Sequence, residues 1–224
     1  IRKAIKINPN YAMAHYNLGL IFKDHGDLKQ AELSLRKATE ISTNFVEAHN
    51  NLGIIMKEIG DLEQAEFSIR KAIKINPNYE IAHYNLGLVF KDRGNLKQAE
   101  LSLRKATEIN PGLATAHNNL GIILKNLGRF EEAAISTRKA IKIRPNYVEA
   151  YNNLGAIMKS LGKLEEAALC MRKSIDIKPD LAETYFNLGL ILKDLGNSKE
   201  EKNCYESCLK LKPNDLSFNL QSKL

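Results

Sequence analysis

A short motif recurs along the chain at a fixed interval of 34 residues, and this period limits what the chain can fold into. The motif starts as HYNLG at His15 and is still recognisable as YFNLG at Tyr185. Its glycines are equally spaced, at Gly19, Gly53, Gly87, Gly121, Gly155 and Gly189. Such a period is typical of stacked helical repeats, none of which can bury its apolar face alone. The sequence therefore predicts a single all-α array whose core grows one repeat at a time.

The period divides the chain into repeats, and positions within a repeat are counted from its first residue. Six full repeats are predicted at residues 12–45, 46–79, 80–113, 114–147, 148–181 and 182–215. Residues 1–11 match the second half of a repeat, because IRKAIKI at Ile1 returns at Ile69, and we interpret them as the remnant of a preceding repeat. Residues 216–224 are predicted as a C-terminal capping helix. The chain starts in mid-pattern without Met, so we interpret it as a fragment of a longer protein.

Turn residues split each repeat into two antiparallel helices. Glycine is always at position 15, where it suits the left-handed residue that ends a helix. In the first three repeats, a side chain at position 16 is expected to cap the second helix, with Gln three residues later as in a capping box. The residues are Asp27, Asp61 and Asn95, followed by Gln30, Gln64 and Gln98. Pro77 and equivalent prolines then stop the second helix. Asn78, Asn146 and Asp180 are expected to cap the first helix that follows each of them.

Small residues mark where the two helices of a repeat meet. Glycine at position 8 lets the partner helix approach closely, and alanine recurs at positions 20 and 27. The spacing aromatic-x-x-Leu-Gly-x-x-aromatic, then Ala, Ala and Pro, resembles the tetratricopeptide repeat, although His or Tyr stands where that family often has Trp. The resemblance covers essentially the whole chain. It implies a right-handed superhelix of helix pairs whose first helices line a concave groove.

An asparagine at position 6 of every repeat is the first candidate for this groove. An amide has two donors and one acceptor, so it can pair with a peptide backbone of any sequence. The row resembles the asparagine ladder in the superhelix of O-linked N-acetylglucosamine transferases, which holds extended protein substrates. Alternatively, the amide bonds a neighbouring helix, or repeats because a gene segment was duplicated. The six residues are Asn17, Asn51, Asn85, Asn119, Asn153 and Asn187.

An aliphatic residue at position 9 points away from the core face and is the second candidate. A single exposed leucine is ordinary, but a row of them suggests a partner surface. Aromatic residues at position 5, Tyr16 and Tyr84, extend the row. The alternative is packing against the adjacent repeat. The position 9 residues are Leu20, Ile54, Leu88, Ile122, Ala156 and Leu190.

Lysine at position 12 of every repeat would form a basic edge to the groove. Acids at position 13, such as Asp24, partly neutralise the row, which favours a solvated face. A groove with amides, an aliphatic floor and a basic edge would suit an extended peptide with acidic groups. The lysines are Lys23, Lys57, Lys91, Lys125, Lys159 and Lys193.

The remaining residues argue against a cofactor, a metal or an active site. His15 and its equivalents lie at a core position in separate repeats, too far apart to share an ion. The three cysteines form no CxxC pair and are interpreted as structural thiols in a reducing compartment, so we expect a cytoplasmic location. No nucleophile with a nearby base and no phosphate-binding loop stands out from the repeat pattern.

Charge and hydropathy constrain the partners. The net charge of +7 permits attraction to acidic partners, but the repeats are too uniform to spell a nucleic-acid sequence. No apolar run approaches the ~20 residues that cross a bilayer. We therefore expect a non-catalytic scaffold that binds an extended peptide of another protein, with a substrate-presenting part of a larger transferase as a variant. The alternative is a self-associating module that forms a homo-oligomer.

Overall fold

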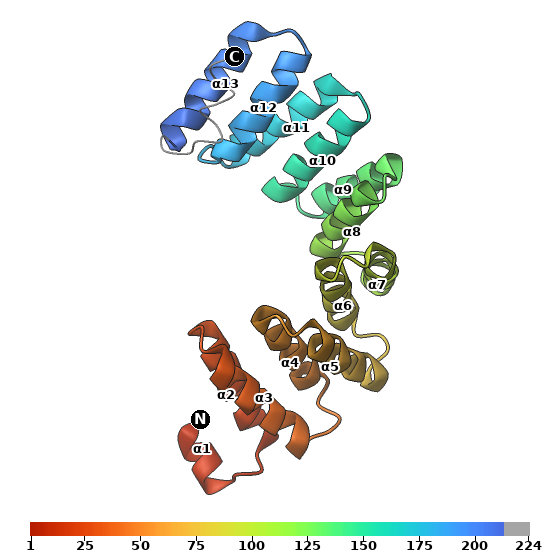
Figure 1. Cartoon of the computed structure of the whole chain (residues 1–224). Helices are drawn as coiled ribbons and strands as arrows, with labels where there is room; N and C mark the ends of the chain where they lie inside the picture. The colour runs from red at the N-terminus through yellow and green to blue at the C-terminus, as the bar shows by residue number, and fades with distance from the viewer. Residues whose placement is uncertain (213–224) are drawn as a thin grey trace. The chain divides into compact units, whose positions relative to one another are not determined.

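The computed structural model describes residues 1–212, and this part of the chain is built of helices without strands (Figure 1). The prediction of an all-α stack of helix pairs is confirmed. The chain divides into two compact units, Ile1–Pro111 and Gly112–Leu224. The last three residues of the sixth predicted repeat and the predicted capping helix at 216–224 lie outside the described residues.

The first unit contains a short helix followed by three antiparallel pairs. Helix α1 packs on α2, the pairs are α2/α3, α4/α5 and α6/α7, and within the unit α3 also packs on α4 and α5 on α6. The bounds are α1 Arg2–Ile7, α2 Ala12–Asp24, α3 Leu28–Ile41, α4 Val46–Ile59, α5 Leu62–Ile75, α6 Glu80–Asp92 and α7 Leu96–Ile109.

The second unit contains three further pairs, α8/α9, α10/α11 and α12/α13. Its first helices begin at the residues where the period places them, as they do in the first unit. The bounds are α8 Ala114–Asn126, α9 Phe130–Ile143, α10 Val148–Ser160, α11 Leu164–Ile177, α12 Ala182–Asp194 and α13 Ser198–Leu211.

The turn inside each pair has the predicted glycine conformation, and the predicted side-chain caps form in the first repeats, whereas Arg129 and Lys163 at the starts of α9 and α11 make no capping bond. All six position 15 glycines have φ between 72° and 96°, the left-handed region that favours glycine. Asp61 then caps α5, since its Oδ1 accepts from the backbone N–H of Gln64 at 3.0 Å. Asp27 caps α3 in the same way, from Gln30 at 3.1 Å. The predicted N-caps of these second helices are therefore confirmed.

The turn between pairs differs from the prediction. Asn78 does not cap α6, because the N-cap residue is Tyr79, which makes no side-chain capping bond. Instead, the backbone N–H of Asn78 donates to the Oδ1 of Asn76 at 3.0 Å. The amide that organises this turn thus comes before the proline rather than after it. The N-cap residues of α10 and α12 are likewise Tyr147 and Leu181, so the predictions for Asn146 and Asp180 were wrong.

The closest approach within a pair occurs at the position 8 glycine. A Cβ added at Gly53 would overlap the Cγ1 of Ile69 and lie 3.0 Å from the carbonyl oxygen of Ala65. Ala65 and Ala72, on the facing helix α5, are fully buried. The missing side chain therefore sets the spacing between the two helices of a pair, as the sequence predicts.

We expect Gly53→Ala to lower the free energy of unfolding by about 1–3 kcal/mol, because the new methyl group meets a branched side chain and backbone that cannot move aside cheaply. Gly155→Ala is the matched control. There the added Cβ would lie 2.7 Å from the Cε of Met171, the mobile end of a flexible side chain. Urea unfolding of both variants measures the difference, and an equal or smaller loss for Gly53→Ala would contradict this account.

Candidate functional site

The position 6 amides connect consecutive first helices. Three of them donate from Nδ2 to the side chain at position 5 of the preceding pair, a bond that we call a rung. The rungs inside the two units are Asn51 to Tyr16 Oη at 3.1 Å, Asn85 to Asn50 Oδ1 at 3.0 Å, and Asn153 to Asn118 Oδ1 at 3.0 Å. These amides therefore bond a neighbouring helix, as the structural alternative predicted.

The amides differ in their exposure. Asn85 is only 8% exposed, which corrects the expectation that position 6 lies at the edge of a free surface. Its burial follows from its rung, because Asn50, which accepts the bond, is 2% exposed. Asn17 is exposed, whereas Asn119 and Asn187 are half-buried. Asn119 also donates to the Thr115 carbonyl of its own helix at 3.0 Å.

The rungs leave the amide carbonyl oxygens as acceptors. In the described residues, Asn51, Asn85 and Asn153 use Nδ2 and make no hydrogen bond through Oδ1. Within residues 1–212, the only fully buried side-chain polar atom without a partner is Ser174 Oγ. The three carbonyl oxygens must therefore reach solvent. Each of these amides therefore uses its donor within the stack and keeps an acceptor that solvent can reach.

The position 9 aliphatic residues lie beside these amides on the first helices. All six side chains are half-buried, so they are neither sealed between pairs nor fully exposed: Leu20, Ile54, Leu88, Ile122, Ala156 and Leu190. Tyr16 and Tyr84 are also half-buried. The ring of Tyr16 packs against Phe45 at 4.8 Å between centroids, and burial, with a contribution from Glu47, raises the pKa of its hydroxyl. This tyrosine is therefore a neutral hydrogen-bonding group at physiological pH.

The position 12 lysines are largely consumed by ion pairs between repeats. The contacts run from position 12 to position 13 of the next pair: Lys23 to Glu58 at 3.7 Å, Lys57 to Asp92 at 2.9 Å, and Lys159 to Asp194 at 2.9 Å. Lys91 lies 3.9 Å from its neighbour Asp92. Among residues 1–212, Lys125 and Lys193 form no ion pair. The predicted basic edge is therefore mostly neutralised, and partly exposed pairs of this kind contribute little stability.

The recurrent histidines hold the turns between pairs. The Nε2 of His49 donates to the Thr43 carbonyl at 2.9 Å, and His83 bonds the Pro77 carbonyl in the same way at 2.9 Å. Burial lowers the pKa of His49, with a further lowering from Lys71. In the part of the chain that the structure describes, no group of three or more His, Cys, Asp or Glu side chains could hold a metal ion.

The cysteine thiols lie in the helix stack. Burial raises the pKa of Cys170 to about 11, so its reactive thiolate is scarce at neutral pH. Burial also raises the pKa of Cys204. These are the properties of structural thiols.

The most exposed apolar row was missed by the sequence reasoning. It lies at position 22 of the second helices, where the side chains are 52–62% exposed: Leu33, Phe67, Leu101, Ile135 and Leu169. The signal was an apolar residue every 34 residues on the face that carries the position 25 and 26 cations. The candidate residues were predicted only on the first helices, which do not include this row. Over residues 1–212, no helix is both long and apolar enough to cross a bilayer.

Replacing Asn85 by Ala should lower the free energy of unfolding by about 1–3 kcal/mol, because the buried Oδ1 of Asn50 would lose its donor. Asn17→Ala is the matched control, since this exposed amide makes no hydrogen bond within the described residues. Chemical unfolding should find the control within about 0.5 kcal/mol of the unaltered chain. Equal stability of the two variants would show that the rung has no structural role.

Comparison with protein families finds repeat models along the chain. Models described as "Tetratricopeptide repeat" match residues 1–32, 46–79, 114–147, 137–168 and 182–215. A model described as "TPR repeat" matches residues 87–128 and 157–196. A comparison with curated proteins gave no significant match.

Solved structures share the fold at low sequence identity. YrrB, described as "a TPR protein with an unusual peptide-binding site", is 20% identical with a TM-score of 0.70, over 85% of this chain and 98% of YrrB. MamA is 25% identical with a TM-score of 0.69, over 77% of this chain and 98% of MamA. PilW, a type IV pilus biogenesis factor, is 20% identical with a TM-score of 0.85, over 94% of this chain and 97% of PilW.

Proposed function

The chain belongs to the tetratricopeptide repeat family, and from this premise we propose that it is a non-catalytic scaffold whose first helices bind an extended peptide segment of another protein. The binding surface consists of the position 6 amides and the position 9 aliphatic residues. YrrB, which shares the fold, is itself described as having a peptide-binding site.

The observation that carries the proposal is the orientation of the rung amides. Because Nδ2 of Asn51 and Asn85 is held by the preceding pair, Oδ1 points to solvent as a fixed acceptor. An extended peptide has unpaired backbone N–H groups, which such acceptors can bind whatever the peptide sequence is. Holding the amides in advance reduces the entropy lost on binding. The rungs therefore join neighbouring repeats and also hold the acceptors that bind the extended peptide.

The aliphatic residues supply the apolar part of this surface. Leu20, Ile54 and Leu88 follow the amides along the first helices of one unit and are half-buried. They still have apolar area to bury, and about 25 cal/mol is gained for each Å² removed from water. Amides fix the peptide backbone and aliphatic residues bind alternate side chains.

A narrower form of the proposal assigns the peptide to the substrates of a transferase borne by the same polypeptide. It is supported by the similarity of the asparagine row to the ladder of O-linked N-acetylglucosamine transferases. Transfer of N-acetylglucosamine to the captured peptides by a polypeptide that carries both these repeats and a transferase domain would test this form separately.

Binding is tested with a random peptide library displayed on phage, selected on the immobilised chain, followed by anisotropy titration of the recovered peptides. Leu20→Ser with Leu88→Ser should weaken binding at least about tenfold, because two apolar contacts are lost. Leu33→Ser with Leu101→Ser is the matched control, with the same residue type in the same two pairs but at position 22. Thermal melting verifies that both variants fold. Equal effects of the two double variants would refute the proposed surface.

Self-association is the second candidate function, and the exposed position 22 row favours it. Leu101 and Leu169 are 61% and 62% exposed, and a row of such residues is typical of an interface. A homo-oligomer formed in this way would bury the second helices. Sedimentation velocity across a concentration series should then find an oligomer for the unaltered chain. The double variant Leu33→Ser with Leu101→Ser should sediment as a monomer. A monomer at every concentration would exclude this candidate.

A further inference from the structure

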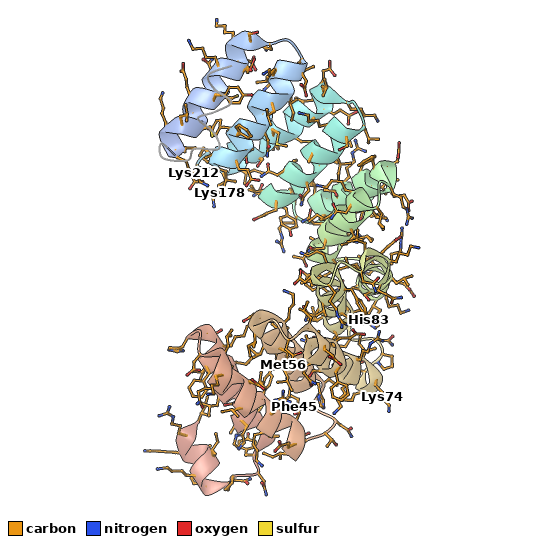
Figure 2. The ribbon with its side chains drawn as sticks, viewed as in Figure 1. Phe45, Met56, Lys74, His83, Lys178 and Lys212 are labelled. Atoms are coloured by element: carbon orange, nitrogen blue, oxygen red, sulfur yellow. The ribbon has the colours of Figure 1, made fainter. Side chains whose placement is uncertain are left out.

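The first unit contains a pocket on the side of its second helices, with a volume of about 850 Å³. It lies between α3, α5 and the start of α4. Figure 2 marks the region through Phe45, the N-cap residue of α4, and Lys74, in the last turn of α5. None of its lining residues occupies positions 5, 6, 9 or 12. The pocket is therefore separate from the first-helix surface proposed for the peptide, although it shares Phe67 with the position 22 row.

Residues that depart from the neighbouring repeats line this pocket. Thr43 stands where Pro77 and the other later repeats have proline, and Thr39 stands where the next repeat has Ile73. Phe67 is the only aromatic residue at position 22. The combination of threonine in place of proline with an aromatic residue at position 22 of the next repeat occurs only at this junction in the sequence. Both threonines and Phe67 line the pocket.

The charges around the pocket are not balanced. Glu40 lies 3.4 Å from Lys37, and Arg36 lies 2.8 Å from Glu32, so these groups already have partners. Lys71 and Lys74 also line the pocket, and neither forms an ion pair within residues 1–212.

The position of Lys71 brings positive charge close to apolar surface. Its Nζ lies 4.6 Å from the ring centroid of Phe67, a cation–π contact. His49 also lines the pocket. Burial is the main cause of the lowered pKa of His49, and the charge of Lys71 lowers this pKa further. The local potential is therefore positive.

The lining selects for one class of ligand. Leu52, Phe67 and Ile75 form an apolar wall that a bare inorganic anion would leave unfilled. An uncharged apolar ligand would leave the lysines uncompensated. Ser68, Gln64 and Thr43 add hydroxyl and amide groups that can pair with a peptide backbone. We propose that this pocket binds an acidic peptide segment in which a carboxylate lies next to an aliphatic or aromatic side chain.

The test uses the whole chain and a fluorescein-labelled octapeptide of alternating Glu and Leu, titrated by anisotropy. A peptide of alternating Gln and Leu is the ligand control. Lys71→Gln with Lys74→Gln should weaken binding of the acidic peptide about tenfold, because both unpaired cations are removed. Lys139→Gln with Lys142→Gln removes the same charge at the same positions of another repeat, and should change binding less than about twofold. All four lysines are exposed, so melting temperatures should stay unchanged.

A further variant tests the shape of the pocket without altering charge. Thr43→Pro restores the residue of the later repeats and keeps the carbonyl that accepts from His49. It should weaken binding of the acidic peptide while the chain remains folded.

Three outcomes would overturn the proposal. If both double lysine variants weakened binding equally, the acidic peptide would be attracted only by the overall net charge of +7 and not by this pocket. Equal affinity for the Gln–Leu peptide would show that the carboxylates are not recognised. Loss of binding in Leu20→Ser with Leu88→Ser, but not in the Lys71 and Lys74 variant, would assign the acidic peptide to the first-helix surface. That last result would leave the proposed function intact.

Discussion

The contact between a position 8 glycine and the facing second helix is the constraint on which each helix pair depends. No side chain separates Gly53 from Ile69 and the backbone of Ala65, and the other pairs repeat this arrangement. Close packing of this kind leaves no room for a methyl group, because protein interiors are as dense as organic crystals. With the pair spacing set, the first helices of neighbouring pairs come within hydrogen-bonding distance. The polar contacts between repeats follow from that spacing.

Those polar contacts explain why uniform repeats make a scaffold rather than a chain of separate hairpins. A repeat contacts only its neighbours, so coupling between them must be renewed at every junction. Here Asn85 reaches Asn50, His49 reaches the carbonyl of Thr43, and Lys57 reaches Asp92. The same rungs that couple repeats leave amide oxygens toward water. A single asparagine can therefore have both a structural and a binding role. Its recurrence every 34 residues does not show which of the two roles it has.

Much of the fold and part of the candidate site could be predicted from the sequence. The period placed the starts of the helix pairs, and turn chemistry placed Gly60 and Asp61. The prediction failed at Asn78, since the turn at Pro77 uses the side-chain amide of Asn76, the residue before the proline. The position 6 amides were identified, but the partner of Asn85 was not, because a helical wheel describes one helix and ignores the next. Position 22 and the pocket near Thr43 were missed because they depend on what neighbouring second helices leave uncovered.

The sequence by itself determined the period, the helix pairs, the glycine contact and the identity of every repeated polar residue, because these depend on local propensity and on spacing along one chain. Only the tertiary structure decided which of those residues are used up by the stack. Asn85 and Lys57 are the same residue types as Asn17 and Lys125, yet within residues 1–212 the first two are bonded across a junction and the others are not. The physical reason is that a hydrogen bond or an ion pair needs a partner within about 3–4 Å, and the neighbouring repeat supplies that partner or withholds it.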